Sequence, residues 1–205
     1  FRFHQAHQDA DMRQRMRLDH AMRQALASQR FRLHYQPQID LKTGNVVGAE
    51  ALIRWRDPAL GEVSPARFIP VAEESGLIVP LGRWALHAAV ATLAEWDAKA
   101  GGNCGLRMAV NVSAMQFNDD NFTAKVQNIL AETGLPASLF ELEITESIAM
   151  SNPDRVIRLL EPLRNKGVRI AIDDFGTGHS NLAALTRMPF DVFKIDQSFI
   201  SALGK

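Results

Sequence analysis

Alternating apolar and polar positions predict a series of short strands along the chain. The run Leu139-Phe-Glu-Leu-Glu-Ile-Thr145 alternates at every residue, which is typical of a strand with one buried face. Similar runs, several of them bounded by turn-forming residues, recur along the sequence. They predict six strands over the ranges Phe31–Ile39, Val46–Trp55, Leu106–Ser113, Leu139–Thr145, Val168–Asp173 and Asp191–Asp196.

Helix-like segments fill most of the intervals between these strands. Ser64-Pro65 predicts a helix start, because serine caps the first turn and proline fits its first position. Glycines end helices, and Gly101-Gly102 therefore marks the end of a longer one. The predicted helices begin at Ser64-Pro65, at Val79, near Phe122, at Asn152-Pro153 and after Ser180. This alternation of strands and helices favours a parallel α/β fold, either a barrel or a doubly wound sheet.

The polar ends of the strands distinguish these two folds. A doubly wound sheet is covered by helices on both faces, so its strands should be apolar on both. Here each strand keeps one apolar face, whereas the other becomes polar toward its end, as Asn111 and Ser113 do beside Val110 and Val112. A barrel explains this pattern because its C-terminal mouth collects side chains from several strands. We therefore predict a (β/α) barrel.

The first 30 residues differ from the rest in being rich in Arg, Gln and Met. Apolar residues recur there at near-helical spacing, at Met12, Met16, Leu18, Met22, Ala25 and Leu26. The segment can be a solvated helix packed on one face, or a connector from a preceding domain. We divide the chain accordingly into a linker helix, residues 1–30, and a barrel domain, residues 31–205.

Composition narrows the functional class. The 23 basic residues balance the 23 acidic ones, so nothing favours a nucleic-acid polymer or an anionic membrane as a partner. A single cysteine, Cys104, is consistent with a reducing compartment. No apolar stretch reaches the roughly 20 residues needed to cross a bilayer. We expect a soluble cytoplasmic domain without a membrane segment, although other domains could anchor the parent protein.

Eight polar residues are expected at the barrel mouth. Their carboxylates would repel one another unless cations lie among them. Oxygen ligands without histidine or thiol indicate Mg²⁺ or Mn²⁺ rather than Zn²⁺. Adjacent aspartates at a strand end could hold a pair of ions, as two-metal phosphoryl chemistry requires. The mouth residues are Gln36, Glu50, Arg54, Asn111, Glu143, Asp173, Asp174 and Lys194.

Several of these residues have plainer interpretations. Arg54 could hold a phosphate or form a salt bridge to a neighbouring carboxylate. Lys194 could orient a water molecule or simply balance the carboxylates. Asp173-Asp174 alone could be a helix cap. A dinucleotide fingerprint at Gly176-Thr-Gly178 is disfavoured, because Asn181 replaces the third glycine and two aspartates precede the loop.

Seven motifs follow one another from about Phe31 to the end of the chain. The run Glu50-Ala-Leu-Ile-Arg-Trp55 is accompanied by Tyr35-Gln-Pro37, Phe68-Ile-Pro-Val-Ala-Glu73, Asn111-Val-Ser113, Glu141-Leu-Glu-Ile-Thr-Glu146, Asp173-Asp-Phe-Gly-Thr-Gly178 and Lys194-Ile-Asp196. Together they resemble the EAL domain, a family of cyclic-di-GMP phosphodiesterases. The N-terminal helix is similar to the linker that follows a GGDEF domain in tandem GGDEF–EAL proteins.

The resemblance implies a TIM-type (β/α) barrel that hydrolyses cyclic-di-GMP to linear pGpG with two Mg²⁺ or Mn²⁺ ions. It implies that Glu50, Asn111, Glu143 and Asp173 hold the first ion, and that Asp173 and Asp174 hold the second and take part in catalysis. It also implies a homodimer and an upstream GGDEF domain.

Further residues take roles by the same resemblance. Gln36, Leu52 and Arg54 would contact the cyclic dinucleotide, and Lys194 would help to position the attacking water. Glu146 would support the loop that follows Phe175, which in the family links the metal site to dimerisation.

Two features depart from the family. His179 stands where the family usually has tyrosine. Residues 31–205 also suffice for only about six βα units, whereas eight need roughly 250 residues. A late glutamate that assists the water in the family is absent, so we expect a C-terminally incomplete domain. The alternative functions are a non-hydrolysing cyclic-di-GMP receptor and, less favoured by the polar mouth, a dimerisation module without a ligand.

Overall fold

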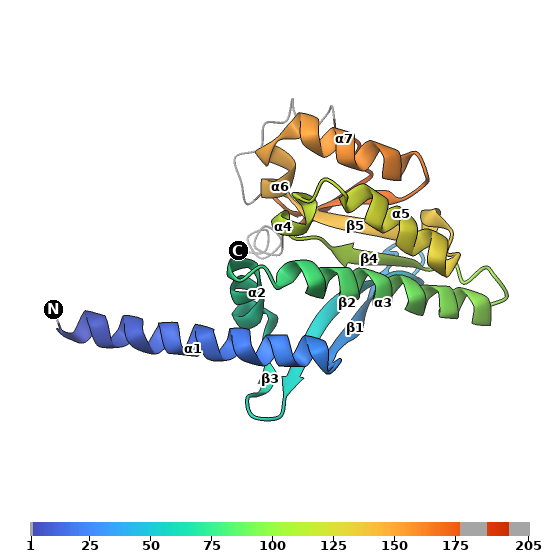
Figure 1. The fold of residues 1–205 in the computed structure, drawn as a ribbon. Coiled ribbons are helices and arrows are strands. Elements are labelled where there is room, and N and C mark those ends of the chain that lie inside the picture. The colour runs from blue at the N-terminus through green and yellow to red at the C-terminus, as the bar shows by residue number, and fades with distance from the viewer. Residues whose placement is uncertain (1, 177–187, 197–205) are drawn as a thin grey trace.

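The computed structural model describes residues 2–176 and 188–196, with side chains from residue 12 onward. One mixed sheet organises this part of the chain (Figure 1). Its strands are hydrogen-bonded in the order β1-β2-β4-β5-β6-β7, and β3 pairs with β2. The strands are β1 (Phe31–Ile39), β2 (Val46–Asp57), β3 (Gly61–Val63), β4 (Arg107–Asn111), β5 (Phe140–Thr145), β6 (Arg169–Phe175) and β7 (Val192–Ile195).

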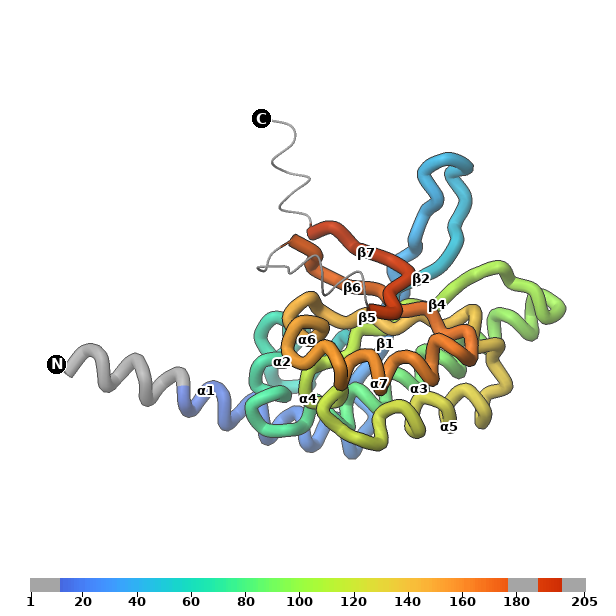
Figure 2. Tube along the Cα trace, turned by 90° about the horizontal axis from the view of Figure 1, so that it is seen from above, coloured from blue at the N-terminus to red at the C-terminus, as the bar shows by residue number. Residues whose placement is uncertain are grey.

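The helices that cover the sheet lie mainly on one face. Figure 2 shows α3, α5 and α7 side by side on the same side of the strands, and the β1–β2 hairpin projecting away from them. The helices are α1 (Arg2–Ala27), α2 (Pro65–Glu74), α3 (Ile78–Lys99), α4 (Ala114–Phe117), α5 (Phe122–Thr133), α6 (Glu146–Ser151) and α7 (Pro153–Arg164), with a 3-10 turn η1 at Ala137–Leu139. The six predicted strands are confirmed, whereas β3, α4 and α6 were missed. The helix predicted after Ser180 lies outside the described residues.

The direction of the first strand corrects the all-parallel prediction. Strands β2, β4, β5, β6 and β7 are parallel to one another, but β1 runs antiparallel to β2, with Phe31 opposite Trp55. The connection from Ile39 to Val46 is too short for a parallel crossover, which needs a dozen or more residues. The fold is therefore an α/β barrel type that opens with a hairpin. The hydrogen bonding among the described strands does not close into a ring.

The main core lies between the sheet and helices α3, α5 and α7. Strand β5 shows how the sequence produces it, because Phe140, Leu142 and Ile144 on one face are almost completely buried. They pack against apolar residues of the helices, including Leu93 and Leu160. The alternation of β5 leaves its glutamates on the opposite face, where the mouth lies.

A second core attaches the end of α1 to the barrel. Leu18, Met22 and Ala25 of α1 are buried with Trp55 and Phe68. The two aromatic rings meet edge to face at 5.8 Å between centroids, which is a favourable geometry for such pairs. The C-terminal half of α1 is thus packed on the domain.

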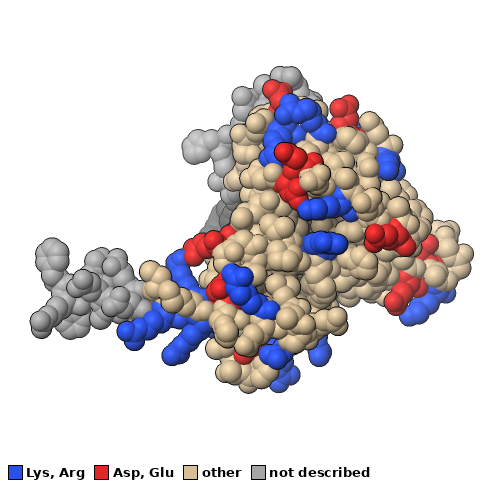
Figure 3. Space-filling view, in the orientation of Figure 1, with Lys and Arg blue, Asp and Glu red and all other residues tan. Residues whose placement is uncertain are grey.

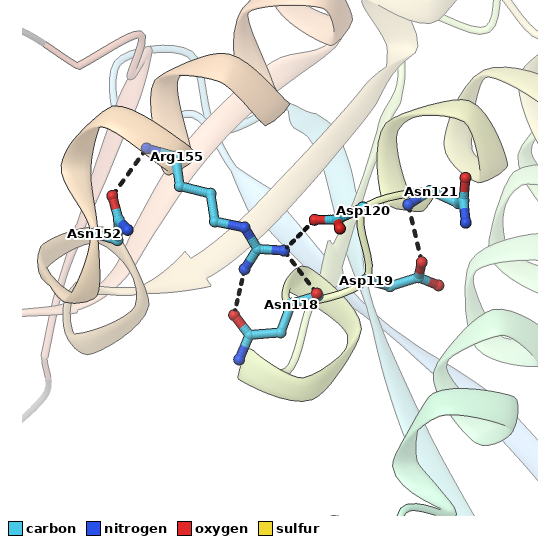
Figure 4. Close-up of polar contacts among 6 residues, drawn as sticks. All are labelled: Asn118, Asp119, Asp120, Asn121, Asn152 and Arg155. Carbon is cyan, nitrogen blue, oxygen red and sulfur yellow. Dashed lines mark hydrogen bonds and ion pairs between the residues drawn. The ribbon is translucent and has the colours of Figure 1, made fainter.

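An arginine connects the loop before α5 to the start of α7 (Figure 4). The Arg155 guanidinium donates to Oδ1 and the backbone O of Asn118, both at 2.6 Å, and to Oδ1 of Asp120 at 2.9 Å. Its own backbone N–H donates to the side chain of Asn152, which caps α7. These contacts hold two sequence-distant segments together at one end of the helical layer.

Charged side chains of both signs are interspersed over the face shown in Figure 3. This distribution agrees with the net charge of zero for the whole chain. Within residues 2–176 and 188–196, every helix is too short or too polar to cross a lipid bilayer.

Candidate active site

Parallel register brings most of the predicted mouth residues together. Glu50 of β2 lies opposite Gln36 of β1 and Ala109 of β4. One strand further, Asn111 at the end of β4 lies opposite Glu143 of β5. Because parallel strands present their C-terminal ends at the same edge of the sheet, these side chains converge there.

A lysine ammonium lies at the centre of this group. Lys194 Nζ donates to Glu143 Oε2 at 2.8 Å and to Glu50 Oε2 at 2.9 Å, and it lies 3.5 Å from Asp173 Oδ1. The Asn111 amide donates to the other oxygen of Glu50, Oε1, at 2.8 Å. Lys194 therefore contacts three of the predicted metal ligands directly, Glu50, Glu143 and Asp173. The fourth, Asn111, joins the group through its hydrogen bond to Glu50.

Burial sets the electrostatics of this group. Glu143 has no exposed surface, and this burial raises the pKa of its carboxyl to about 7, although Lys194 limits the rise. Burial alone would lower the pKa of Lys194, but Glu143 and Glu50 outweigh it and the pKa of the ammonium is raised. The Oε1 atom of Glu143 is buried without a hydrogen-bond partner among the described residues, which is costly for a carboxylate.

A break in strand β6 shapes the position of the two aspartates. The register between β6 and β7 shifts between Ile172 and Phe175, and Asp174 has a φ of 55°. Left-handed backbone is uncommon for a residue with a side chain, and such strain is concentrated at functional sites. Burial and the nearby carboxylates of Asp173 and Asp196 raise the pKa of Asp174. The charges of the mouth residues therefore act on the Asp174 carboxyl.

Glu146 lies directly after β5, at the start of α6. It is buried, and its Oε2 accepts the backbone N–H of Gly176 at 2.9 Å. Its side chain therefore reaches the first residues after β6, at the beginning of the loop to which the resemblance links it. His179, in the same loop, lies outside the described residues.

The predicted dinucleotide contacts lie along the β1–β2 hairpin. Gln36, Leu52 and Arg54 share the face that carries Glu50, since they occupy alternate positions in register. The Arg54 guanidinium donates to the backbone O of Ile53 at 2.9 Å. Among the described residues no ion pair of Arg54 is found, so its salt-bridge interpretation stays an alternative to the phosphate contact.

The donor chemistry of the cluster fits a hard divalent cation. Three carboxylates meet at a common ammonium, and the side-chain amide of Asn111 donates to one of them; oxygen ligands are those that Mg²⁺ and Mn²⁺ prefer. The Oε1 atom of Glu143, which no described residue contacts by a hydrogen bond, offers a further ligand atom. In the described residues, however, no three acidic, histidine or cysteine side chains are already arranged around one metal position. In this structure the ammonium of Lys194 supplies the positive charge that compensates the carboxylates. Charge compensation was one of the two roles that the sequence allowed for this lysine.

Two features of the site were missed from the sequence. Arg32 lies directly opposite Arg54 in the hairpin, and the length of the connection from residue 40 to residue 45 could have indicated this pairing. Glu141, buried at 6% exposure, forms an ion pair with Arg169 at 3.3 Å. Burial nonetheless raises the pKa of Glu141, against the opposing effect of Arg169.

Comparison with known proteins assigns the family. A family model described as the EAL domain matches residues 19–205. The chain belongs to the EAL domain family. The match begins inside α1, near the residues of that helix that pack on the barrel.

Curated relatives are similar to this chain over nearly its whole length. The bifunctional diguanylate cyclase/cyclic di-GMP phosphodiesterase MucR of Pseudomonas aeruginosa is 41% identical, covering 98% of this chain and 29% of its own length. The cyclic di-GMP phosphodiesterase NbdA of the same organism is 43% identical, covering 91% and 24%. The cyclic di-GMP phosphodiesterase PdeR of Escherichia coli is 39% identical, covering 92% and 28%. The chain thus spans about a quarter of the length of these relatives.

Solved EAL structures share the fold. The PaMucR phosphodiesterase in complex with c-di-GMP superposes with a TM-score of 0.86 at 43% identity, covering 91% of this chain and 75% of that chain. The FimX EAL domain from Pseudomonas aeruginosa bound to c-di-GMP gives a TM-score of 0.81 at 28% identity, covering 92% and 74%. The TIM-type barrel architecture of the family is therefore confirmed for this chain.

Proposed function

We propose that this EAL domain hydrolyses cyclic-di-GMP to linear pGpG with the help of divalent cations. The observation that carries the proposal is the convergence of Glu50, Asn111, Glu143 and Asp173, in which the buried Oε1 of Glu143 has no hydrogen-bond partner within the described part of the chain. The names of MucR, NbdA and PdeR support the substrate and the reaction.

The carboxylate cluster would hold the cations. Glu50, Asn111, Glu143 and Asp173 would bind one Mg²⁺ or Mn²⁺, and Asp173 with Asp174 would bind a second. When bound, the ions would supply charge neutralisation for the phosphodiester and lower the pKa of water. The break in β6 at Asp174 supports this arrangement, because it interrupts the strict alternation of side chains along the strand.

Other residues would bind and orient the substrate. Gln36, Leu52 and Arg54 line the same hairpin face as Glu50 and would contact the cyclic dinucleotide. Lys194 would position the attacking water from the centre of the carboxylate group. Glu146 would fix the loop after β6 through the N–H of Gly176.

The setting of the domain remains part of the proposal. We expect residues 1–30 to link a GGDEF domain to the barrel of residues 31–205, and the barrel to form a homodimer. The bifunctional name of MucR supports the first expectation. A cytoplasmic location would agree with the single cysteine of the sequence.

The decisive experiment is cyclic-di-GMP turnover, with pGpG separated by chromatography in Mg²⁺ or Mn²⁺. We expect the wild-type chain to produce pGpG, chelation with EDTA to abolish the reaction, and Asp173→Asn to do the same. Asp154→Asn, an exposed residue in the first turn of α7 with no role assigned at the mouth, is the matched control and should keep full activity. Binding of cyclic-di-GMP without turnover, in this chain and in a C-terminally longer one, would instead identify a receptor and contradict the catalytic roles.

A further inference from the structure

A small pocket lies in the helical layer between α3 and α5, the two helices that Figure 2 shows side by side. It has a volume of about 190 Å³. Three buried apolar side chains line it, Leu86 of α3 and Phe122 and Ile129 of α5. The pocket contains none of the residues assigned to the carboxylate cluster or to the dinucleotide. We call it the α3–α5 pocket.

A buried amide adds a polar group to this lining. Gln116 of α4 lines the pocket and is only 6% exposed. Its Oε1 accepts the backbone N–H of Ser113 at 3.2 Å and the Ser113 hydroxyl at 3.1 Å. Because a backbone N–H can only donate, these contacts fix the orientation of the amide. The Nε2 atom has no hydrogen-bond partner among the described residues, so an acceptor in the pocket would satisfy it.

A glycine in α3 makes room for this amide. A Cβ at Gly82 would lie 2.2 Å from Nε2 of Gln116. Glycine inside a helix is less favourable than alanine, so the polar group is kept at the pocket at a cost in helix stability. The next residue, Arg83, also lines the pocket. The amide and a guanidinium therefore belong to the same turn of α3.

The charges of the lining leave one cation without a counter-charge. Lys125 is paired with Asp119, whereas Arg83 is exposed and forms no ion pair with any residue that the structure describes. A guanidinium matches a carboxylate well, because it can donate two parallel hydrogen bonds to it. A ligand with a single negative charge would therefore complete the charge balance of the pocket.

The volume of the pocket limits the size of that ligand. An apolar cavity of about 150 Å³ binds benzene, so the α3–α5 pocket has room for one such ring with a small substituent. A broader hollow of about 540 Å³ adjoins it along the same two helices. The pocket and the hollow share Pro80, Arg83, Lys125 and Ile129, which gives a ligand an open approach.

We propose that the α3–α5 pocket binds a small monocarboxylic acid with an apolar ring. The ring packs on the buried apolar side chains of α3 and α5, and the carboxylate accepts hydrogen bonds from Arg83 and from the Gln116 amide. The uncompensated positive charge selects a monoanion over a neutral molecule of the same shape. The proposal does not depend on cyclic-di-GMP chemistry, because it uses no residue of the carboxylate cluster.

The test compares phenylacetate with 2-phenylethanol, which keeps the ring but has a hydroxyl group in place of the carboxylate. Each is titrated into the ¹⁵N-labelled chain and followed by two-dimensional NMR. We expect phenylacetate to bind roughly 5-fold more tightly, because a charge-assisted hydrogen bond adds to the ring contacts. The side-chain amide signals of Gln116 should shift with phenylacetate.

Two variants locate the carboxylate and the ring. Arg83→Gln should reduce the preference to about 2-fold or less and leave the affinity for 2-phenylethanol unchanged. Val79→Trp, which fills the pocket from a half-buried wall position, should abolish binding of both molecules. Arg158→Gln, which replaces an exposed arginine of α7, is the matched control and should keep the wild-type preference.

Several results would overturn the proposal. Equal affinity for both molecules would identify a plain apolar hollow, suited to a side chain of a partner protein. An Arg83→Gln variant that keeps the full preference would place the carboxylate elsewhere. Signal shifts confined to residues outside α3, α4 and α5, or unchanged binding by a folded Val79→Trp variant, would place the whole ligand elsewhere. Arg83→Gln changes an exposed side chain, so its result stands even if Val79→Trp does not fold.

Discussion

Replacing Lys194 by methionine tests the electrostatic organisation of the mouth. The substitution keeps most of the side-chain volume but removes the ammonium from Glu50, Glu143 and Asp173. Glu143 has no exposed surface, so its charge is left without compensation. Removing one partner of a buried pair costs roughly 3–5 kcal/mol, and the partial exposure of Lys194, 26%, places the expected loss near the lower value, about 3 kcal/mol.

The assay is thermal unfolding of the metal-free protein in EDTA. For a domain of this size, a loss of about 3 kcal/mol lowers the melting temperature by roughly 6–12 °C. Lys99→Met is the matched control, because the pair of Lys99 with Glu95 is exposed at 76% and 71% and is expected to contribute under about 1 kcal/mol. Adding Glu143→Gln to the Lys194→Met variant should restore much of the stability.

The same variant reports on cation binding. With the ammonium absent, we expect Mn²⁺ to raise the melting temperature of Lys194→Met more than that of the wild type, since the carboxylates no longer have a positive partner. The reasoning would be refuted if Lys194→Met were no less stable in EDTA than Lys99→Met. Equal stabilisation of wild type and variant by Mn²⁺ would show that the cation does not enter this cluster.

Three further substitutions test the packing, each by urea unfolding. Gly82→Ala should cost about 1–3 kcal/mol, because a Cβ there would lie 2.2 Å from the buried Gln116 side chain; no loss would mean that Gln116 can move aside. Trp55→Phe should change stability by less than about 1 kcal/mol, because the lost ring area is offset by removing a buried indole N–H that has no hydrogen-bond partner among the described residues; a loss above 3 kcal/mol would contradict this. Arg155→Gln should cost about 1–3 kcal/mol through its lost bonds to Asn118, and an unchanged denaturation midpoint would show that these bonds are not formed.

Strand alternation was sufficient to place much of the mouth from the sequence. In β5, apolar residues at 140, 142 and 144 force Glu143 onto the opposite face. Asn111 and Glu50 follow from the same period in β4 and β2, and their contact follows from the parallel register. These are local patterns, and a period of two determines the face of each residue.

The remaining features depend on contacts that no local pattern specifies. The register shift in β6 and the left-handed Asp174 interrupt the alternation, so a strict period of two misplaces the second aspartate. Lys194 reaches a residue 144 positions earlier in the chain, Glu50. The distances between the Lys194 ammonium and the carboxylate oxygens show that this lysine compensates their charge. Such distances cannot be obtained from the sequence. The antiparallel β1 was missed because helix–strand alternation was applied to a connection too short for a helix.

The reversed first strand has a consequence for how the polypeptide is threaded. In a regular (β/α) barrel the first strand begins at the end opposite the catalytic loops. Here Phe31 begins β1 beside Trp55, near the C-terminal end of β2. The polypeptide therefore enters the sheet at the end that carries the mouth residues. Only Ser28, Gln29 and Arg30 separate α1 from that strand. A torque applied along α1 would therefore reach the hairpin that carries Glu50 through only three residues, in addition to its direct packing on Phe68 of α2.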